Sequence, residues 1–357
     1  MGTWHLNGVV LPDGERRDLW IHDGVITFEP VAGAQTLTTG VWITPGLVDA
    51  HCHIGLGASG AVDHATAEAQ AIIDRNSGVL LVRDAGAPAD THWIDERADL
   101  PRIIRAGRHI ARPKRYIRNF AIEIDPSEMV EEVSRQAHSG DGWVKLVGDW
   151  IDREVGDLAP LWPAEIAKQA IDAVHAVGAR VTAHCFAEQS VAELVAAGID
   201  CIEHGTGMSD EVIEMMAAND VALVPTMTNL VNFPKFAAAG AERFPTYAAH
   251  MRDLHARRLD TLGRAREAGV QIYCGTDAGG TLGHGRVAQE AQMLAELGGN
   301  DFALGAIGWD ARTWLGAQNL VEGAPADLVC WFVDPRQELS TLHDPALVVL
   351  RGEPVSR

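Results

Sequence analysis

The chain has 357 residues, which is longer than a typical single domain of about 100–200 residues. Hydrophobic residues make up 47% of it and charged residues 22%, a balance that excludes the disordered and fibrous classes. The 49 acidic residues outnumber the 29 Lys and Arg residues, so the formal charge of −20 argues against nucleic acids and anionic membranes as partners.

Targeting signals and disulfide patterns are not evident. The first ten residues lack a basic segment followed by an apolar stretch, and no uncharged apolar run approaches the roughly 18 residues of a membrane span. The five cysteines are scattered and never spaced as Cys-x-x-Cys, which disfavours structural disulfides and a Cys-rich zinc site. We therefore expect a cytoplasmic protein.

Both ends of the chain have the pattern of short strands joined by turns. The predicted strand regions are residues 3–11, 18–28, 327–333 and 346–350. Within the first two, Asn7-Gly8 and Asp23-Gly24 are hairpin-turn signals. Because chain termini often lie close together, we predict one composite β-sandwich formed by residues 1–43 and 320–357.

Between these ends, short apolar runs alternate with segments of helical period, the pattern of strand-helix units around a parallel sheet. The predicted strands are residues 41–53, 79–84, 102–106, 143–147, 180–184, 201–204, 222–225 and 271–277. Predicted helices over 165–177, 187–197 and 253–268 each end at a glycine, as helix C-termini often do. We predict an α/β fold, with a (β/α)₈ TIM-type barrel over residues 44–319.

Six residues at or near the ends of these strands carry the chemistry. They are His51, His53, Lys145, His184, His204 and Asp277. Strand alternation puts His51 and His53 on one side and Cys52 on the other. Because the loops after barrel strands build one open face, we expect the six side chains to meet there.

Imidazole and carboxylate groups suit Zn²⁺ or a similar divalent ion, and a metal with an open position generates hydroxide near neutral pH. This chemistry is typical of a hydrolase. Lys145 is a poor ligand as an ammonium ion, but its amine can take up carbon dioxide to form an anionic carbamate that bridges two metals. Alternatively, Lys145 pairs with an acid and touches no metal.

Several segments together resemble the amidohydrolase superfamily, and within it the imidazolonepropionase-like and Xaa-Pro dipeptidase-like branch. They are Ile43–His53, Lys145, His184, Glu203-His204-Gly205, Gly275–Gly279 and Ala324–Val329. The resemblance covers nearly the whole chain. It implies a distorted barrel with a binuclear centre, two divalent metal ions with zinc as the expected metal, and carboxylation of Lys145.

The resemblance also implies roles for the individual residues. His51, His53 and Asp277 would hold the more buried metal, and His184 and His204 the more exposed one. Carboxylated Lys145 would bridge the two. Asp277 would take a proton from a metal-bridging hydroxide and pass it to the leaving group. The implied reaction is hydrolysis of an amide-type C–N bond in an N-acyl amino acid, a dipeptide or a cyclic amide.

Two departures from the family patterns leave alternatives open. True imidazolonepropionases lack the strand-four lysine, and dipeptidase-like members often carry Gly-Gly-His where this chain has Gly107-Arg108-His109-Ile110. The group that polarises the substrate carbonyl is therefore not identified. A mononuclear zinc deaminase, a lactonase or other ester hydrolase, and a non-catalytic binding protein on the same barrel are the alternatives.

The loops at the open face supply the candidate substrate-binding residues. Residues 112–118 form a basic island in an acidic chain, and its arginines either are solvated or clamp a substrate carboxylate. The candidates are His109, Arg112, Arg115, Tyr116, Trp150, Asn229 and His284. A small molecule is the expected partner, and the oligomeric state, a homo-oligomer included, is left open.

Neighbouring residues have plainer interpretations. Asp49 lies on the same side of its strand as His51 and either orients a ligand imidazole or sits below the site. Arg83 is predicted to form an ion pair with Asp84 that supports the following loop. Thiols beside the predicted ligands are expected to be buried and inert.

Overall fold

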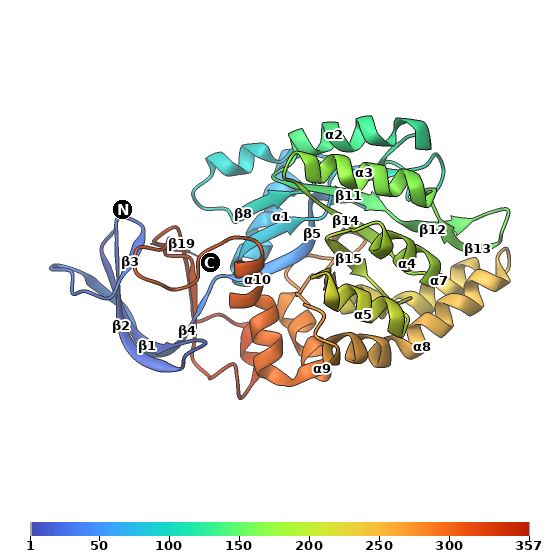
Figure 1. The fold of residues 1–357 in the computed structure, drawn as a ribbon. Helices are drawn as coiled ribbons and strands as arrows, with labels where there is room; N and C mark the ends of the chain where they lie inside the picture. Colours follow the sequence, from blue (N-terminus) through green and yellow to red (C-terminus); the bar gives the residue numbers. More distant parts are fainter. Residues whose placement is uncertain (1, 357) are drawn as a thin grey trace.

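Strands from the two chain ends form one sheet in the computed structural model, which describes residues 2–356 (Figure 1). The seven strands have the order β20-β19-β18-β4-β1-β2-β3. Their bounds are β1 Trp4–Val10, β2 Glu15–His22, β3 Val25–Thr27, β4 Gln35–Pro45, β18 Leu328–Trp331, β19 Leu347–Leu350 and β20 Glu353–Pro354. This sheet occupies the left of Figure 1, away from the larger body of the molecule.

The first predicted turn is wrong. Strand β1 runs through Asn7-Gly8 and pairs in parallel with β4. A Cβ atom at Gly8 would overlap the carbonyl oxygen of Val41, so this glycine permits close approach of two strands and makes no turn. The second predicted turn is confirmed, because Asp23 and Gly24 both have positive φ between β2 and β3.

Two further sheets of mainly parallel strands form the body. One has the order β17-β5-β7-β8 with β6 paired to β5, and the other has the order β10-β9-β11-β14-β15-β16. The first contains β5 Leu47–Gly57, β6 Gly60–Ala61, β7 Val79–Asp84, β8 Arg102–Arg105 and β17 Ala278–Gly280. The second contains β9 His109–Ala111, β10 Ala121–Glu123, β11 Trp143–Val147, β14 Arg180–Cys185, β15 Cys201–His204 and β16 Ala222–Val224. A hairpin of β12 Asp149–Asp152 and β13 Asp157–Pro160 follows β11.

The last predicted barrel strand, residues 271–277, is not a regular strand. Ile272 makes one isolated parallel bridge to Leu223. Further along, the amide of Ala50 donates to the carbonyl of Cys274, so the segment connects β16 of one sheet to β5 of the other. Within residues 2–356, no ladder joins β8 to β11, and the predicted closed ladder of eight regular strands is therefore not present.

Helices surround the two sheets. Their bounds are α1 His64–Asn76, α2 Met129–Ser139, α3 Ala164–Ala176, α4 Glu188–Ala196, α5 Asp210–Ala218, α6 Met227–Leu230, α7 Phe233–Gly240, α8 Pro245–Glu267, α9 Val287–Ile307 and α10 Trp309–Trp314, with short 3₁₀ turns at His92–Glu96, Pro126–Glu128 and Leu339–His343. Helices α3 and α4 confirm the prediction to within a residue at each end. Helix α8 begins at Pro245, earlier than predicted, because proline is well suited to the first turn. The glycines after these helices, Gly178, Gly198 and Gly269, all have positive φ.

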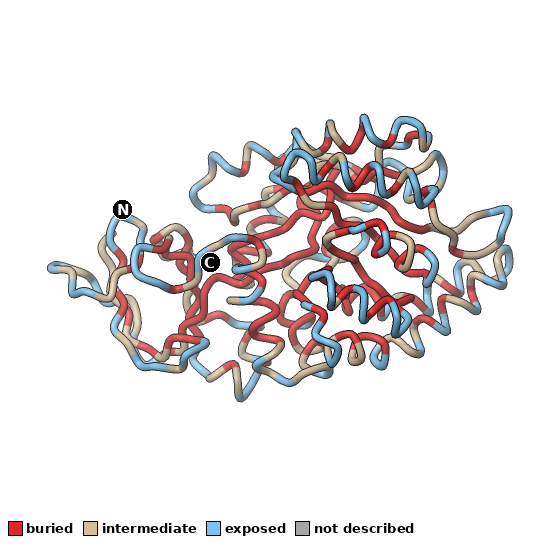
Figure 2. The backbone as a smooth tube through the Cα atoms, viewed as in Figure 1, coloured by how far each residue is buried: buried red, intermediate tan, exposed pale blue. Residues whose placement is uncertain are grey.

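The two sheets of the body are mostly buried, and the outer faces of the surrounding helices are exposed to solvent (Figure 2). Strand β5 is buried from Leu47 to Leu56, as expected for a parallel strand covered on both faces. Polar side chains on such strands need partners, and their arrangement defines the site below. In the described part of the chain, no helix is both long and apolar enough to cross a membrane.

Candidate metal centre and substrate cavity

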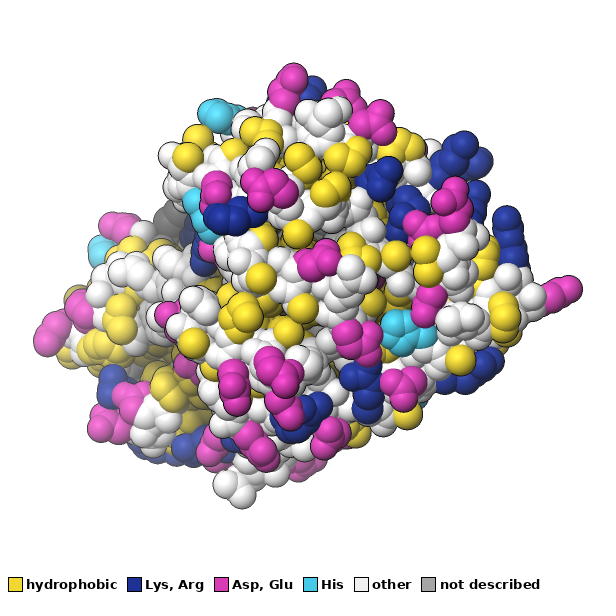
Figure 3. Space-filling model, turned by 45° about the vertical axis from the view of Figure 1, so that its right-hand side comes forward, with side chains coloured by type: hydrophobic (Ala, Val, Ile, Leu, Met, Phe, Trp, Pro, Cys, Tyr) yellow, Lys and Arg dark blue, Asp and Glu magenta, His cyan; other side chains and the backbone are white. Residues whose placement is uncertain are grey.

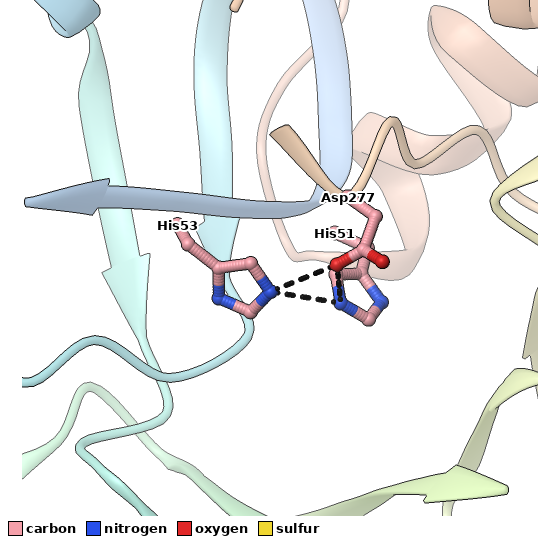
Figure 4. Close-up of side chains that lie close together, drawn as sticks. All are labelled: His51, His53 and Asp277. Atoms are coloured by element: carbon pink, nitrogen blue, oxygen red, sulfur yellow. Dashed lines mark hydrogen bonds and ion pairs between the residues drawn. The ribbon is translucent and has the colours of Figure 1, made fainter. Parts of the chain in front are cut away.

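Three of the six predicted ligands converge on one point (Figure 4). Nε2 of His51 and Nε2 of His53 lie 3.1 Å apart. Each of these atoms lies 3.0 Å from the same carboxylate oxygen, Oδ1 of Asp277. The two histidines come from β5, and Asp277 directly precedes β17, so the irregular segment 271–277 ends by placing Asp277 beside β5.

The second nitrogen of each histidine is held by an acceptor. Nδ1 of His51 donates to Oε2 of Glu203 at 2.6 Å, and Nδ1 of His53 donates to the carbonyl of Gly86 at 2.7 Å. Since the Nδ1 protons are used there, both Nε2 atoms present lone pairs towards Asp277. Two imidazole lone pairs and a carboxylate oxygen so close together form a donor set that fits a divalent cation.

Glu203 links this donor set to the barrel interior. Its Oε1 accepts from Nη2 of Arg83 at 2.6 Å and from the hydroxyl of Thr182, and both Arg83 and Glu203 are fully buried. Burial raises the pKa of the Glu203 carboxyl, but Arg83 and His51 outweigh it and hold that pKa well below its usual range. The carboxylate therefore stays charged and fixes the tautomer of His51.

The prediction that Arg83 pairs with Asp84 is wrong. Adjacent residues of a strand point to opposite sides, so Arg83 faces Glu203 while Asp84 accepts the amide of Gly86 at 2.8 Å. Nε of Arg83 also donates to the carbonyl of Ala50 at 2.7 Å. Arg83 thus holds Glu203, the partner of His51, and the backbone of β5 in place.

Strained backbone accompanies the site. His204, Asp277 and Thr226 all have positive φ, a conformation uncommon for residues other than glycine. A Cβ atom at Gly275 would lie 2.5 Å from Cβ of His51. The Gly275-Thr276-Asp277 segment therefore requires glycine where it passes His51.

Asp49 sits below the centre, one of the two positions expected for it. Its Oδ1 accepts the amides of Thr276 at 3.0 Å and His51 at 3.2 Å. Burial raises the pKa of Asp49 to about 7. Its contacts are to backbone and to a hydroxyl, so Asp49 orients the loop that carries Asp277 rather than a ligand ring.

Lys145 is buried in β11, with 1% of its surface exposed, and its Nζ has no hydrogen-bond partner. Burial and the neighbouring Arg83 lower the pKa of Lys145, although Glu203 and Asp277 oppose this. An unpaired buried amine is costly, and this one lies among the predicted ligands. The alternative ion pair of Lys145 with an acid has no counterpart among its hydrogen bonds and salt bridges.

His184 and His204 lie next to each other, with ring centroids 4.7 Å apart, and the His204 ring is 5.2 Å from that of His51. Nδ1 of His204 lies 2.6 Å from the Thr226 hydroxyl, which leaves Nε2 free for a metal. Nε2 of His184 is buried without a hydrogen-bond partner, and Oδ1 of Asp149 lies 3.9 Å from it. Burial, and next the neighbouring histidine, lowers the pKa of His184 well below its usual value.

A cavity of about 400 Å³ opens beside these histidines. Polar residues of the centre and a larger number of apolar and aromatic residues line it. They are His53, Leu56, Ala58, His109, Tyr116, Ile117, Phe120, Trp150, His184, Phe186, Asn229, Phe236, Ala239, Tyr247, Asp277, Gly279, Gly280, Thr281 and Leu282. Asn229 reaches the centre directly, because its Nδ2 donates to Oδ2 of Asp277 at 2.6 Å.

Four of the seven candidate substrate-binding residues line this cavity: His109, Tyr116, Trp150 and Asn229. Nδ1 of His109 is buried without a hydrogen-bond partner, and its ring lies 5.1 Å from that of His53. Burial lowers the pKa of His109 well below its usual value, so the imidazole is neutral.

The other three candidates lie elsewhere. Arg115 donates to Asp152 at 2.6 Å and to the carbonyls of Trp150 and Ala159, so it fastens its loop to the β12–β13 hairpin. Arg112 does not line the cavity. These contacts give no support to a carboxylate clamp.

His284 lies on the opposite face of β5 from the centre. Its Nδ1 lies 2.7 Å from Oδ2 of Asp74 and 3.6 Å from Sγ of Cys52. Asp74 also accepts the amide of Gly285 at 2.9 Å, so this cluster anchors the loop after β17 to α1. All five cysteines are buried and free, which confirms that the thiols beside the predicted ligands are buried.

Sequence reasoning missed three supporting residues: Arg83 as the partner of Glu203, Thr226 beside His204, and Asp149 beside His184. Their partners come from other strands, and no spacing pattern marks them. Glu203 belongs to a segment that resembles the family, but the sequence alone indicates no role for it. Its position directly before the predicted ligand His204 is the sequence feature that could have indicated a supporting role.

Buried histidines and a carboxylate at the C-terminal edge of parallel strands, beside a cavity, define a metal-dependent enzyme class built on an α/β fold of the TIM-barrel type. The model of the amidohydrolase family matches residues 42–307, and the chain belongs to this family. The protein is thus an enzyme, a hydrolase that acts on carbon–nitrogen bonds, and its family generally uses metal ions.

Relatives of this chain occur in mycobacteria. Proteins of Mycobacterium tuberculosis and Mycobacterium bovis, each described as uncharacterized, are 57% identical over 350 residues, which cover 98% of this chain and 94% of theirs. The descriptions of these relatives indicate no substrate.

Solved structures share the fold at lower identity. A putative prolidase from Bifidobacterium longum has a TM-score of 0.84 at 24% identity, covering 100% of this chain and 95% of that one. A Xaa-Pro dipeptidase with bound methionine in its active site gives 0.82 at 20% identity, with 100% of both chains covered. Ochratoxinase from A. niger gives 0.79 at 20% identity, covering 99% of this chain and 95% of that one.

Proposed function

We propose that the protein hydrolyses an amide-type C–N bond with two divalent metal ions, zinc being the expected metal. His51, His53 and Asp277 would hold one ion, His184 and His204 the other, and carboxylated Lys145 would bridge them. The observation that carries the proposal is the convergence of two Nε2 atoms on one Asp277 oxygen, with both Nδ1 atoms already committed to acceptors.

The environment of Lys145 supports its proposed carboxylation. An amine whose pKa is lowered by burial is more often unprotonated, and only the unprotonated amine adds carbon dioxide. The carbamate would supply two anionic oxygens near His51 and His184. Both histidines are close enough to Lys145 for its charge to affect their pKa values. It would also relieve the missing hydrogen bonds of Nζ.

Bound metal ions would activate a water molecule and polarise the substrate carbonyl. Asp277 would take the proton of that water and deliver it to the leaving nitrogen. Asn229 holds the second carboxylate oxygen of Asp277 in place. Neutral His109, which lines the cavity, would donate a hydrogen bond to the substrate carbonyl.

The prolidases and dipeptidase of the same fold support a small-molecule amide substrate. N-acyl amino acids, dipeptides and cyclic amides are all members of this class. We further propose a cytoplasmic location and a division into the hydrolase domain, residues 44–319, and a composite β-sandwich of residues 1–43 and 320–357.

Metal removal and return tests the proposal. Chelation should abolish release of amine from an amide panel, and added Zn²⁺ or Mn²⁺ should restore it with two ions per chain by elemental analysis. One ion per chain together with ammonia release would instead identify the mononuclear deaminase. Hydrolysis of lactones but not amides would identify the esterase alternative.

Asp277→Asn isolates the proposed proton transfer. The variant should keep much of its metal while turnover falls by about 10²–10⁴-fold, the usual contribution of a general acid–base group. Asp301→Asn, which changes an exposed aspartate of α9, is the matched control and should leave turnover unchanged. Near-normal turnover of Asp277→Asn would contradict the role.

A further inference from the structure

The wall of the cavity is mostly apolar. Apart from the residues of the metal centre, its lining is dominated by aromatic and aliphatic side chains. Tyr116 contacts Trp150 edge to face, with ring centroids 4.9 Å apart, and Phe120 at 6.4 Å. These rings form an aromatic wall of the kind that accepts a planar apolar group. Phe236 and Tyr247 bring further aromatic surface from α7 and α8.

Positive charge is missing from this wall. Among the described residues that line the cavity, none is Lys or Arg, and Asp277 is the one with a carboxylate. On the face shown in Figure 3, Lys and Arg side chains are scattered among Asp and Glu side chains, and hydrophobic side chains are exposed between them.

The basic island shows why its cations are absent from the cavity. Within it, Tyr116 and Ile117 line the cavity, whereas the guanidinium of the preceding Arg115 is held by Asp152 and two backbone carbonyls. The loop thus presents its apolar residues to the substrate and uses Arg115 for its own attachment. Arg115, one of the arginines that suggested a carboxylate clamp, therefore stabilises the loop and does not face the substrate cavity.

We infer that the substrate is a neutral amide bearing an aromatic or bulky apolar group, with no free carboxylate beside the scissile bond. A carboxylate held against the aromatic wall, away from the metal centre, would lose its hydration and find no Lys or Arg side chain to pair with. A neutral ring would bury apolar surface against Tyr116 and Trp150 instead. The inference rests on the proposed function, and it selects neutral amides over N-acyl amino acids and dipeptides.

A matched pair of compounds tests the inference. N-benzoyl-phenylalanine and its N-methylamide share the benzoyl amide bond and differ in one charge. With benzoate release as the readout, kcat/KM for the neutral compound should exceed that for the acid by at least about tenfold, since an unpaired buried charge is costly.

A cation placed in the wall should change this preference. Phe236→Arg adds a positive charge at the cavity, and it should reduce or reverse the preference for the neutral compound. Phe236→Gln shortens the same side chain without adding charge and is the control, in which the preference should persist. An unchanged preference in Phe236→Arg would count against the electrostatic explanation.

The possible failures are distinguishable. Faster hydrolysis of the acid by the native enzyme would overturn the inference and leave the proposed amide hydrolysis intact. If the metal-loaded protein cleaves neither compound, the proposed function is in question, and equilibrium binding, measured by isothermal titration calorimetry, decides the inference. Tighter binding of the N-methylamide supports it, and equal or weaker binding overturns it.

Discussion

Arg83 provides the sharpest test of how the centre is supported. Its guanidinium is completely buried, donates to Glu203 and to the carbonyl of Ala50, and lies 4.6 Å from the ring centre of Trp143. Replacement by Met keeps most of the apolar volume but removes the charge. The Glu203 carboxylate would then be buried with His51, Thr182 and the weakly donating thiol of Cys201 as partners.

The expected loss is large. Removing one partner of a buried ion pair typically costs about 3–5 kcal/mol, because the remaining charge is left without compensation. Arg83→Met should therefore lower the free energy of unfolding by about 3–5 kcal/mol. Arg180→Met is a matched control, since Arg180 also stacks on Trp143, at 4.1 Å, and no buried carboxylate depends on it. Its cost should be about 1 kcal/mol.

A double-mutant cycle separates the charge effect from packing. Adding Glu203→Gln to Arg83→Met removes the uncompensated charge, so the pair should recover about 2 kcal/mol relative to the sum of the single losses. Urea unfolding of the chelated protein is the assay, because bound metal would add its own stabilisation. A coupling energy below about 0.5 kcal/mol would refute the reasoning.

Three further predictions concern Lys145, Gly275 and His250. Lys145→Ala should reduce bound metal from about two ions per chain to one or none by elemental analysis, whereas Lys168→Ala, on the exposed face of α3, should leave it unchanged. Gly275→Ala places a Cβ atom against His51 and should cost about 1–3 kcal/mol in urea unfolding and weaken metal binding; native affinity would show that no close approach exists. Glu188 above all raises the pKa of His250 to about 9, so this pair stabilises the fold fully below about pH 6.5 and loses its effect as the pH rises through 9. His250→Gln should therefore cost about 1 kcal/mol at pH 6 and little at pH 10, and a constant difference across this range would contradict the assignment.

Features set by local geometry could be predicted from the sequence. The glycines that end α3, α4 and α8 need positive φ, which the chain itself dictates. The common side of His51 and His53 follows from strand alternation alone, and the structure brings these two residues to Asp277. Their metal binding stays a prediction.

Features that depend on residues distant in the sequence could not be predicted. Gly8 carries the same signal whether it makes a turn or admits a neighbouring strand, and only β4 decides between them. Arg83 stands next to Asp84 in sequence, yet its partner Glu203 comes from β15. The direction of Arg115 depends on the conformation of a long loop, so the basic island was a poor guide to the substrate.

Anomalous X-ray diffraction from crystals of the zinc-loaded protein tests the central claim most directly. The account predicts one peak at about 2.0–2.2 Å from Nε2 of His51, Nε2 of His53 and a carboxylate oxygen of Asp277. It predicts a second peak near His184 and His204, with density for a carbamate on Lys145 between the two. Zinc bound elsewhere, with none beside His51 and His53, would contradict the account.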